Sequence, residues 1–537
     1  MGLTNGCTEA SVLSERGRQA HIKNLPMTYF IPIMDMLKNP WRPDNPSGNL
    51  ILAVAENRLS CDLLGSRLHQ INDLPNNIYG YAPGRGFSRL REAIAQYMKD
   101  TCLQGLELRG EDITVLAGCG AVLDLVIYSI ASDGDSIGIP APYYPAFDND
   151  VKARCGCHAQ PMHLSPGTSL SEQLDAEKAK AAASGKPMRA IIICNPNNPT
   201  GEVIPREILQ EYLEWCCEHN IHLVSDEIYA NSVFKKAQFV SLATILDQSS
   251  AALQEKGRLL VHTVFGLSKD WGISGLRVGW LHTLNQDLTG AMDSLAYFCM
   301  PSTIIQEAAA QMLLDKPFVA AYLQENQQRL AHSYDALTGE LEKAGIPYTP
   351  AVGAIFMWVD LRAALAKPTW EAEEGLWNEV VKAGVLLTPG KACHAAEPGF
   401  FRICYAAVPI EGLMEGIRRV VSIVQTKNGQ RLVKKVKRYR LNHKYGGQTQ
   451  TRSSHPLGSA SRSWQVDVDR VQVGNGEQTY AQAKELLDSW KHLELDWSTC
   501  ALPGIQDGTV QTKEGGQVVL GTRVLGMAHI VSPMRVK

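Results

Sequence analysis

The stretch VFGLSKDWGISGLRVGW, residues 264–280, decides the fold class of this chain, because it places one lysine among small residues just after an apolar run. The amine of Lys269 can form a Schiff base with an aldehyde cofactor and can then move a proton at a substrate carbon. Arg277, eight residues further on, can bind the phosphate of such a cofactor with two parallel hydrogen bonds. A lysine that follows a serine is by itself more often a solvated surface residue. The hypothesis therefore depends on whether the other parts of such a site occur in the chain.

The composition is that of a large globular protein without a strong net charge. The chain has 537 residues, 45% of them hydrophobic, and a net charge of −3, which predicts several domains of about 100–200 residues and neither nucleic-acid nor membrane binding. No apolar run approaches the roughly 20 residues of a membrane helix, and the N-terminus lacks the apolar segment of a secretory signal. The 13 cysteines show neither zinc-ligand spacing nor a disulfide framework, which predicts a reduced, cytoplasmic protein without a metal site.

Predicted strands alternate with helices through the first half of the chain. Apolar strands are expected at residues 113–116, 136–139, 189–194, 221–224 and 259–264. This alternation favours an α/β fold with a mainly parallel sheet, which binds ligands at the carboxyl ends of its strands. Residues with chemistry that suits a cofactor follow these strands: Cys119, Gly120, Tyr144, Asn198, Asp226, Tyr229, Ser268 and Lys269. Each is a weak indication alone, but core packing does not account for their recurrence in this order.

The turn at residues 118–120 has the form of a phosphate-binding turn. Gly118, Cys119 and Gly120 separate a strand from an apolar helix at residues 121–130. A strand, a glycine turn and a helix together point backbone N–H groups at a phosphate, and the helix dipole adds to the attraction. An ordinary connection from strand to helix has the same pattern, so the local sequence leaves both interpretations open.

Three further residues are candidates because of their surroundings. Glu56 follows a short apolar strand at residues 50–54 and is equally well a site acid or an exposed glutamate at the start of a helix. Tyr81 lies in a loop rich in Gly and Pro, where most tyrosines only pack against neighbours. Arg402 lies within the apolar strand GFFRICYAAV, residues 399–408. A buried arginine needs an anion, which is either a protein carboxylate or the carboxylate of a substrate.

Taken in order, these segments resemble fold-type I enzymes of the class I/II aminotransferase superfamily, which depend on pyridoxal phosphate. The resemblance covers residues 25–426 and implies a large domain at about residues 75–310, with a mainly parallel seven-stranded sheet. It also implies a small α+β domain, formed by residues 25–74 and 311–426. Enzymes of this kind are homodimers with shared active sites, so the resemblance implies a homodimer here as well.

The resemblance assigns roles to the residues around Lys269. Lys269 matches the lysine that carries the cofactor as a Schiff base, and Asp226 matches the acid that keeps the cofactor's pyridine nitrogen protonated. Tyr229 and Asn198 match the pair that hydrogen-bonds the phenolic oxygen of the cofactor. Tyr144 matches the aromatic residue that stacks on its ring. Lys269, Asp226 and Tyr229 are therefore the expected catalytic residues.

By the same resemblance, several groups hold the cofactor's phosphate. Cys119 and Gly120 match the backbone contacts to the phosphate, and Arg277 matches the phosphate-binding arginine. Ser268 belongs to the same cofactor-binding set. Tyr81 matches a tyrosine that reaches the phosphate bound by the neighbouring subunit, so a complete site requires two copies of the chain.

Within the superfamily, the chain is similar to 1-aminocyclopropane-1-carboxylate synthases. The similarity rests on AVAENRLSCDLL (residues 53–64), PAPYYPAFDND (140–150) and LSKDWGISGLRVGW (267–280). It implies that Arg402 holds the α-carboxylate of the substrate and that Glu56 lies in the substrate pocket. Those enzymes remove the Cα proton of S-adenosylmethionine and expel methylthioadenosine from Cγ.

Two features depart from that family. Gly266 stands where a serine or threonine usually contacts the phosphate, which removes one hydrogen bond worth about 0.5–1.5 kcal/mol. The loop at residues 81–86 is longer than in the plant synthases and is typical of ordinary aminotransferases. The expected function is therefore action at the Cα, and in the manner of the synthases at the Cγ, of an amino acid or S-adenosylmethionine, in secondary metabolism. An aminotransferase, a carbon–sulfur lyase and a regulatory protein that binds pyridoxal phosphate are the alternatives.

The ends of the chain are expected to differ from this catalytic part. Residues 1–24 are polar and expected to be disordered. Residues 427–463 form a linker that is first basic and then rich in Gly and Ser, and its basic part is typical of a solvated helix end rather than of a nucleic-acid-binding segment. Residues 464–537 resemble an uncharacterised domain family and predict a small α+β unit, with strands at residues 517–524 and 527–531. No function follows for this unit from its sequence.

Overall fold

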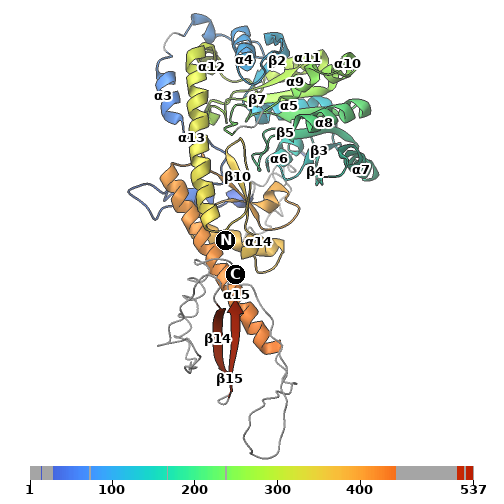
Figure 1. Cartoon of the computed structure of the whole chain (residues 1–537). Coiled ribbons are helices and arrows are strands. Elements are labelled where there is room, and N and C mark those ends of the chain that lie inside the picture. The colour runs from blue at the N-terminus through green and yellow to red at the C-terminus, as the bar shows by residue number, and fades with distance from the viewer. Residues whose placement is uncertain are drawn as a thin grey trace, which may run out of the picture. The chain divides into compact units, whose positions relative to one another are not determined.

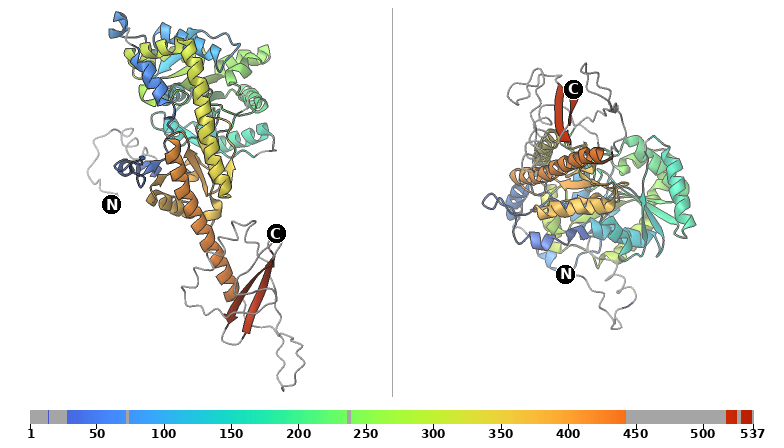
Figure 2. Two further views of the ribbon diagram at one scale, coloured as in Figure 1. Left: turned by 60° about the vertical axis from the view of Figure 1, so that its left-hand side comes forward. Right: turned by 90° about the horizontal axis from the view of Figure 1, so that it is seen from below.

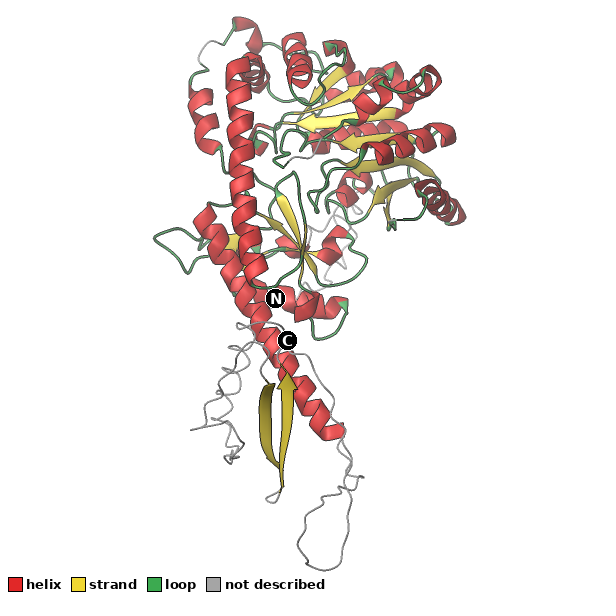
Figure 3. Ribbon diagram, in the orientation of Figure 1, coloured by secondary structure: helices red, strands yellow, loops and turns green. Residues whose placement is uncertain are grey.

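In the computed structural model, a seven-stranded β-sheet forms the centre of the catalytic part of the chain (Figures 1 and 3). The strand order is β2-β8-β7-β6-β5-β3-β4. β8 is antiparallel to both of its neighbours, and the other strands are parallel to one another. The strands are β2 (Ile113–Leu116), β3 (Ser136–Pro140), β4 (His158–Met162), β5 (Met188–Cys194), β6 (His222–Asp226), β7 (Val261–Gly266) and β8 (Gly279–Thr283). The predicted α/β fold with a mainly parallel seven-stranded sheet is confirmed.

The structure describes residue 14 and residues 28–71, 74–165, 167–235, 239–442, 517–524 and 528–535. The chain divides into two compact units, Met1–Val424 and Gln425–Lys537. Nearly all of the N-terminal segment that was expected to be disordered lies outside the described residues, as does most of the expected C-terminal domain. In the part of the chain that is described, no helix has the length and the apolar composition needed to span a membrane.

Both faces of the large sheet are covered, because its strands are apolar on both sides. Along β5, Ala190 and Ile192 pack into one hydrophobic core, while Ile191 and Ile193 pack into another. Successive side chains of a strand point to opposite faces, so the run of apolar residues requires a helix layer on each face. Because β3 to β7 run parallel, their carboxyl ends lie at the same edge of the sheet.

Helices from the same half of the chain form these layers. α5 (Cys119–Ile130) contributes to the core shared with α11 (Gln286–Ala296) and the small domain, whereas α7 (Leu170–Ala183) and α8 (Arg206–His219) contribute to the core on the other face. The remaining helices around the sheet are α4 (Ser88–Asp100), α6 (Phe147–Lys152), α9 (Leu242–Asp247), α10 (Ala251–Leu260) and α12 (Thr303–Leu314).

The long helix α13 (Lys316–Lys343) connects the large sheet to the small domain (Figures 1 and 2). Its first half places Val319 and Tyr322 in the core beside α4 and α12. Its second half places Leu330 and Leu337 in the core that includes the small domain. One helix therefore holds the two sheets at a defined separation.

A four-stranded antiparallel sheet, in the order β12-β13-β10-β9, forms the small domain, together with the parallel pair β1 and β11. Its strands are β1 (Leu50–Ile51), β9 (Tyr348–Thr349), β10 (Phe356–Asp360), β11 (Val385–Leu386), β12 (Thr388–Pro389) and β13 (Phe400–Cys404). Its helices are α2 (Ile33–Met36) and α14 (Trp370–Lys382), and the short 3₁₀ helix η6 (Gly390–Cys393) follows β12. α3 (Cys61–His69) instead places Leu64 in the core that contains residues of α4 and α12. β1 is shorter than the strand expected at residues 50–54, because after Leu52 the chain leaves β11.

The C-terminal part begins within a helix rather than within a loop. α15 runs over Ile410–Asn442, so the basic part of the expected linker is helical as far as residue 442. Beyond it, β14 (Gln517–Val524) and β15 (Ala528–Arg535) form an antiparallel pair in which Gln517 lies opposite Arg535. These two strands agree with the strands predicted at residues 517–524 and 527–531.

Candidate active site

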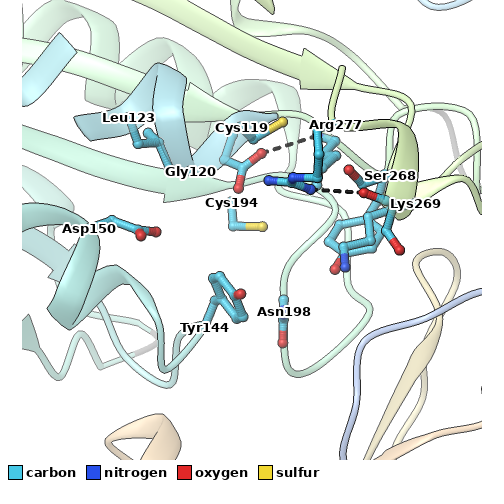
Figure 4. A pocket seen from close by; sticks show the side chains of 14 residues that line it. Cys119, Gly120, Leu123, Tyr144, Asp150, Cys194, Asn198, Ser268, Lys269 and Arg277 are labelled. Atoms are coloured by element: carbon cyan, nitrogen blue, oxygen red, sulfur yellow. Dashed lines mark hydrogen bonds between the residues drawn. The ribbon is translucent and has the colours of Figure 1, made fainter. Parts of the chain in front are cut away.

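A cavity lies where the carboxyl ends of β5, β6 and β7 approach the start of α5 (Figure 4). Its walls bring together residues that the sequence analysis selected on separate strands and loops. These are Cys119, Gly120, Tyr144, Asn198, Asp226, Tyr229, Ser268, Lys269 and Arg277. In Figure 4, Ser268, Lys269 and Arg277 lie on one side of the cavity and Asp150 on the other. The parallel sheet therefore gathers the predicted site at the edge where parallel sheets bind ligands.

Lys269 projects into this cavity from the loop that follows β7. Its Nζ donates a hydrogen bond to the carbonyl oxygen of Ala55. Burial lowers the pKa of the Lys269 amine, and the charge of the nearby Arg402 lowers it further. A buried amine with a lowered pKa is more readily neutral, which is the form that attacks an aldehyde and accepts a proton.

Asp226 ends β6 and is one of two acids, with Asp150, that line the cavity. Its side chain is buried, and its Oδ1 accepts a hydrogen bond of 3.3 Å from the backbone N–H of Ile228. Burial raises the pKa of Asp226 to about 7, and the charge of Lys269 opposes this only in part. A cationic N–H group in the cavity would stabilise the carboxylate form. The protonated ring nitrogen of pyridoxal phosphate is a group of this kind.

The neighbouring acid, Glu227, follows β6 and is not among the residues that line the cavity. Its Oε1 accepts hydrogen bonds from Ser225 Oγ at 2.9 Å and from the backbone N–H of Leu242 at 2.8 Å, at the start of α9. Within the described residues, its Oε2 is buried and has no hydrogen-bond partner. Burial raises the pKa of Glu227 to about 7, from 4.5. The carboxyl group is therefore better suited to the neutral form than to the charged one.

We expect Glu227→Gln to raise the free energy of unfolding, relative to that of the unaltered chain, by more at pH 8 than at pH 5. Because the folded-state pKa exceeds the unfolded-state value of 4.5, the favourable contribution of Glu227 is complete below pH 4.5 and is lost as the pH rises through about 7. That loss amounts to roughly 3 kcal/mol, and glutamine does not titrate. Urea unfolding of the cofactor-free protein at both pH values measures it. An equal difference between the two proteins at pH 5 and pH 8 would contradict the prediction.

The phosphate end of the cavity is built around the first turn of α5. Gly118 precedes the helix with φ of +92°, and a Cβ there would collide with the guanidinium group of Arg277. Arg277 Nη2 donates to the carbonyl oxygen of Ala117 at 3.1 Å, and Nη1 donates to that of Ser274 at 2.9 Å. The guanidinium group therefore lies against the start of the helix, where free backbone N–H groups attract an anion. Together with Lys269 and Asp226, this arrangement fits the phosphate, aldehyde and ring nitrogen of pyridoxal phosphate.

Packing explains why position 266 is a glycine, which has no hydroxyl group to offer the phosphate. A Cβ at Gly266 would lie 2.9 Å from Cys119 Sγ and 2.9 Å from the carbonyl oxygen of Val278. The Cys119 thiol is held there by a hydrogen bond of 3.1 Å to the carbonyl oxygen of Phe265. The space that a serine or threonine would need is therefore filled, and the phosphate end depends on the helix N-terminus and Arg277.

Arg402 lies next to the cavity, at the centre of β13, and its side chain is only 1% exposed. Its Nη1 donates to Asn198 Oδ1 at 2.8 Å, and its Nη2 donates to the carbonyl oxygen of Ala53 at 2.7 Å and to Thr388 Oγ1 at 3.1 Å. The guanidinium group also stacks over the ring of Phe356, at 4.4 Å. These partners are neutral, so they do not balance the buried charge.

One donor of Arg402 has no hydrogen-bond partner in the part of the chain that is described. The buried Nε makes no hydrogen bond within the described residues, and no described carboxylate lies within 4.0 Å of the guanidinium group. A buried charge without a counter-ion costs several kcal/mol. The sequence left open whether a protein carboxylate or a substrate carboxylate neutralises this arginine, and the described residues supply no protein carboxylate.

Besides Arg402, two predicted site residues, Tyr81 and Glu56, do not line this cavity. Tyr81 is 92% exposed, and its expected place in the site of a second subunit stays a prediction. The carboxylate of Glu56 is paired with Arg58, at 2.5 Å. Glu56 nevertheless lies close to the site, since its neighbour Ala55 accepts the hydrogen bond of Lys269 and its own charge acts on the Lys269 amine.

Other lining residues were missed by the sequence analysis: Leu123, Asp150, Cys194, Ile228 and Ser274. Asp150 lies on α6, and burial together with the charge of Asp226 raises its pKa to about 7. Cys194 is the last residue of β5, so the rule that strand ends face the site would have found it. No comparable rule selects Asp150, because helix α6 is too short for its apolar period to show which face is buried. Among the described residues, no group of three or more His, Cys, Asp or Glu side chains is arranged to hold a metal ion.

Comparison with known proteins agrees with this geometry. The model of the family "Aminotransferase class I and II" matches residues 53–420, and that of a domain of unknown function, DUF1990, matches residues 444–537. 1-Aminocyclopropane-1-carboxylate synthase 11 of Arabidopsis thaliana is 32% identical over 417 residues, which cover 75% of this chain and 90% of that protein. 1-Aminocyclopropane-1-carboxylate synthase 2 of Solanum lycopersicum is 31% identical over 451 residues, which cover 81% of this chain and 92% of that protein.

A solved structure of aspartate aminotransferase from Thermus thermophilus with maleate shares the fold, with a TM-score of 0.62 at 22% identity, over 77% of this chain and 100% of that one. The chain belongs to the class I and II aminotransferase family of fold-type I proteins. It is a pyridoxal-phosphate-dependent enzyme of the transferase and lyase type, which confirms the predicted cofactor. The predicted resemblance of its C-terminal part to an uncharacterised domain family is confirmed as well.

Proposed function

We propose that this enzyme acts at the Cα of an α-amino acid or of S-adenosylmethionine, in the manner of a 1-aminocyclopropane-1-carboxylate synthase. The buried, incompletely paired Arg402 beside the cavity of Lys269 carries the proposal. A substrate carboxylate would supply the anion that the described part of the protein does not. An arginine binds a carboxylate through two parallel N–H groups, and its unused Nε–H is one such donor.

The side chains divide the chemistry among them. Pyridoxal phosphate, when bound, withdraws the electrons that develop at a substrate Cα. The Lys269 amine would hold the cofactor's aldehyde and, when not bound to it, would move the proton at the substrate Cα. Asp226 would keep the ring nitrogen protonated, and Arg402 would fix the substrate carboxylate, so that the Cα–H bond faces the Lys269 amine.

The synthase-type outcome is favoured by the relatives rather than by the geometry alone. Proteins named 1-aminocyclopropane-1-carboxylate synthase match most of this chain at 31–32% identity. In such an outcome a leaving group departs from Cγ after the Cα proton is removed. Amino-group transfer and carbon–sulfur cleavage share the same first proton transfer, and the side-chain pocket separates them. A role of this synthase-like enzyme in secondary metabolism is part of the proposal.

Shared active sites between two copies of the chain complete the proposal. Tyr81, which the resemblance assigns to the partner's phosphate, is almost fully exposed in the single chain. The aromatic residues Tyr297 and Phe298 are 60% and 80% exposed. The two surfaces are adjacent, because a Cβ at Gly84 would lie 3.8 Å from the backbone nitrogen of Tyr297. Exposed aromatic residues at one place are typical of an interface, and a homodimer would cover them.

Product analysis tests the proposed reaction. The purified enzyme, loaded with pyridoxal phosphate, is incubated with S-adenosylmethionine, and methylthioadenosine is followed by mass spectrometry. We expect methylthioadenosine release, with an amino-acid product that shows whether a three-membered ring closes. A parallel set of amino acids and 2-oxo acids provides the comparison. Transfer of amino groups within that set, without methylthioadenosine, would replace the proposal by an aminotransferase.

A further inference from the structure

Asp148 connects two segments that are far apart in the sequence. Its Oδ1 accepts a hydrogen bond of 2.6 Å from the hydroxyl group of Tyr143, and its Oδ2 lies 2.8 Å from His394 Nε2. The rings of Tyr143 and His394 stack, with their centres 4.5 Å apart. The backbone N–H of Tyr143 also donates to the carbonyl oxygen of Cys393 at 2.9 Å. One carboxylate therefore closes a compact set of contacts between residues that lie 246 positions apart.

Each segment leads directly to the proposed active site. Tyr143 precedes Tyr144, whose side chain lines the cavity. His394 follows η6, in the connection from β12 to β13, and in that pair Thr388 lies opposite Arg402. The contacts of Asp148 thus join the loop that carries the ring-facing tyrosine to the hairpin that carries the carboxylate-binding arginine.

The hairpin connection is held from its other side as well. Buried Glu373 of α14 accepts hydrogen bonds from the backbone N–H groups of Lys391, at 2.9 Å, and Gly399, at 2.6 Å. The segment between them can therefore move little relative to the small domain. Asp148 links this fixed segment, through His394 and Tyr143, to the loop of the large domain that carries Tyr144.

We infer that Asp148 is a positioning residue, which through Tyr143 and His394 sets the placement of Tyr144 relative to Arg402. The inference rests on the proposed function, in which Tyr144 covers the cofactor ring and Arg402 binds the substrate carboxylate. Without the bridge, the cofactor and the carboxylate-binding arginine remain present, but their separation is no longer fixed. Reaction with a ligand that must reach both groups is then slower, whereas reaction at the cofactor alone is unchanged.

Two reagents separate these effects in the intact enzyme loaded with pyridoxal phosphate. Aminooxyacetate and methoxyamine both react with the aldehyde of the cofactor and displace Lys269, but only aminooxyacetate carries a carboxylate. Stopped-flow loss of the visible absorbance gives a rate constant for each. We expect Asp148→Ala and His394→Ala to lower the rate constant for aminooxyacetate about tenfold or more and to change that for methoxyamine by less than about twofold. Asp148→Asn, which can still accept from Tyr143, should recover most of the loss.

A matched control is available on the outer helices. Asp175 of α7 accepts from Trp215 Nε1 at 3.0 Å and lies 3.4 Å from His219 Nε2, so it makes the same kind of bridge, between an aromatic donor and a histidine, away from the cavity. Asp175→Ala should leave both rate constants unchanged. The cofactor affinity and thermal midpoint of each variant are measured alongside.

The outcomes separate the inference from the proposed function. If the unaltered enzyme shows no preference for aminooxyacetate, or if Arg402→Ala keeps that preference, the proposed role of Arg402 fails and the inference fails with it. If the preference requires Arg402 but survives Asp148→Ala and His394→Ala, only the inference is overturned. An equal loss with both reagents would make Asp148 a structural residue of the cofactor site, which also overturns it.

Discussion

Lys269→Ala is expected to abolish both the visible absorbance of bound cofactor and turnover, by at least about a thousandfold. Lys269 supplies the amine that lines the cavity, and burial lowers its pKa. The neutral form, which can accept a proton, is therefore favoured. Alanine removes the bond to the cofactor and the proton carrier together. Absorbance spectra and steady-state rates of the purified variant measure the two losses.

The variant also separates binding from catalysis. The groups at the phosphate end, the start of α5 and Arg277, remain in place, so weakened cofactor binding should still be detectable by fluorescence titration. Lys256→Ala, a substitution on the outer helix α10, is the matched control and should leave both spectrum and rate unchanged. Turnover by Lys269→Ala at more than a few per cent of the original rate would show that another residue moves the proton.

Arg402→Ala is expected to raise the KM for the amino-acid substrate about 10- to 150-fold, which corresponds to the roughly 1.5–3 kcal/mol of hydrogen bonding to a charged group. The cofactor spectrum should be retained, because Arg402 is not among the residues that line the cavity. Asn198, which loses the donor to its Oδ1, keeps its own amide N–H groups. Kinetics with the substrate identified by product analysis, together with absorbance spectra, check both expectations.

Arg402→Lys provides the second variant, since removal of a buried side chain can also lower stability. Lysine keeps the charge but cannot form two parallel hydrogen bonds to a carboxylate, so a raised KM is expected with a smaller change in thermal midpoint. If either variant binds the cofactor less tightly while its KM for the amino-acid substrate is unchanged, Arg402 is a structural arginine. The proposal that it binds the substrate would then be wrong.

The strand and helix order of the catalytic part was predictable from local sequence. Strands such as β5 (Met188–Cys194) and β6 (His222–Asp226) consist of apolar runs bounded by turns, and alternation with helices leaves few topologies other than a parallel sheet. Because the carboxyl ends of such strands meet at one edge, Asp226 and Lys269 could be assigned to one site before any contact was known. The cofactor follows from that grouping together with the family resemblance.

The ionic partners of individual side chains were not predictable in the same way. The sequence showed Arg402 in an apolar strand but left its anion open, and only the packing of β13 against Asn198 and Thr388 shows that its described neighbours are neutral. Glu56 forms a salt bridge with Arg58 beside the site. This pairing was not predictable, because it depends on the path of the chain after β1. Asp150 enters the cavity from a helix of six residues, which is too short to reveal its buried face.

The sequence by itself therefore determined the fold class, the family and the residues that can do chemistry, because these depend on apolar periodicity and on residue types next to strand ends. The tertiary structure decided which of these residues meet, which charges lack partners and which connections, such as that of Asp148 to His394, join the two sheets. The physical reason is distance along the chain. Local patterns reflect neighbours within a turn or a strand, whereas burial and contacts such as those of Arg402 with Asn198 and of Asp148 with His394 join residues hundreds of positions apart, which meet only when the cores pack.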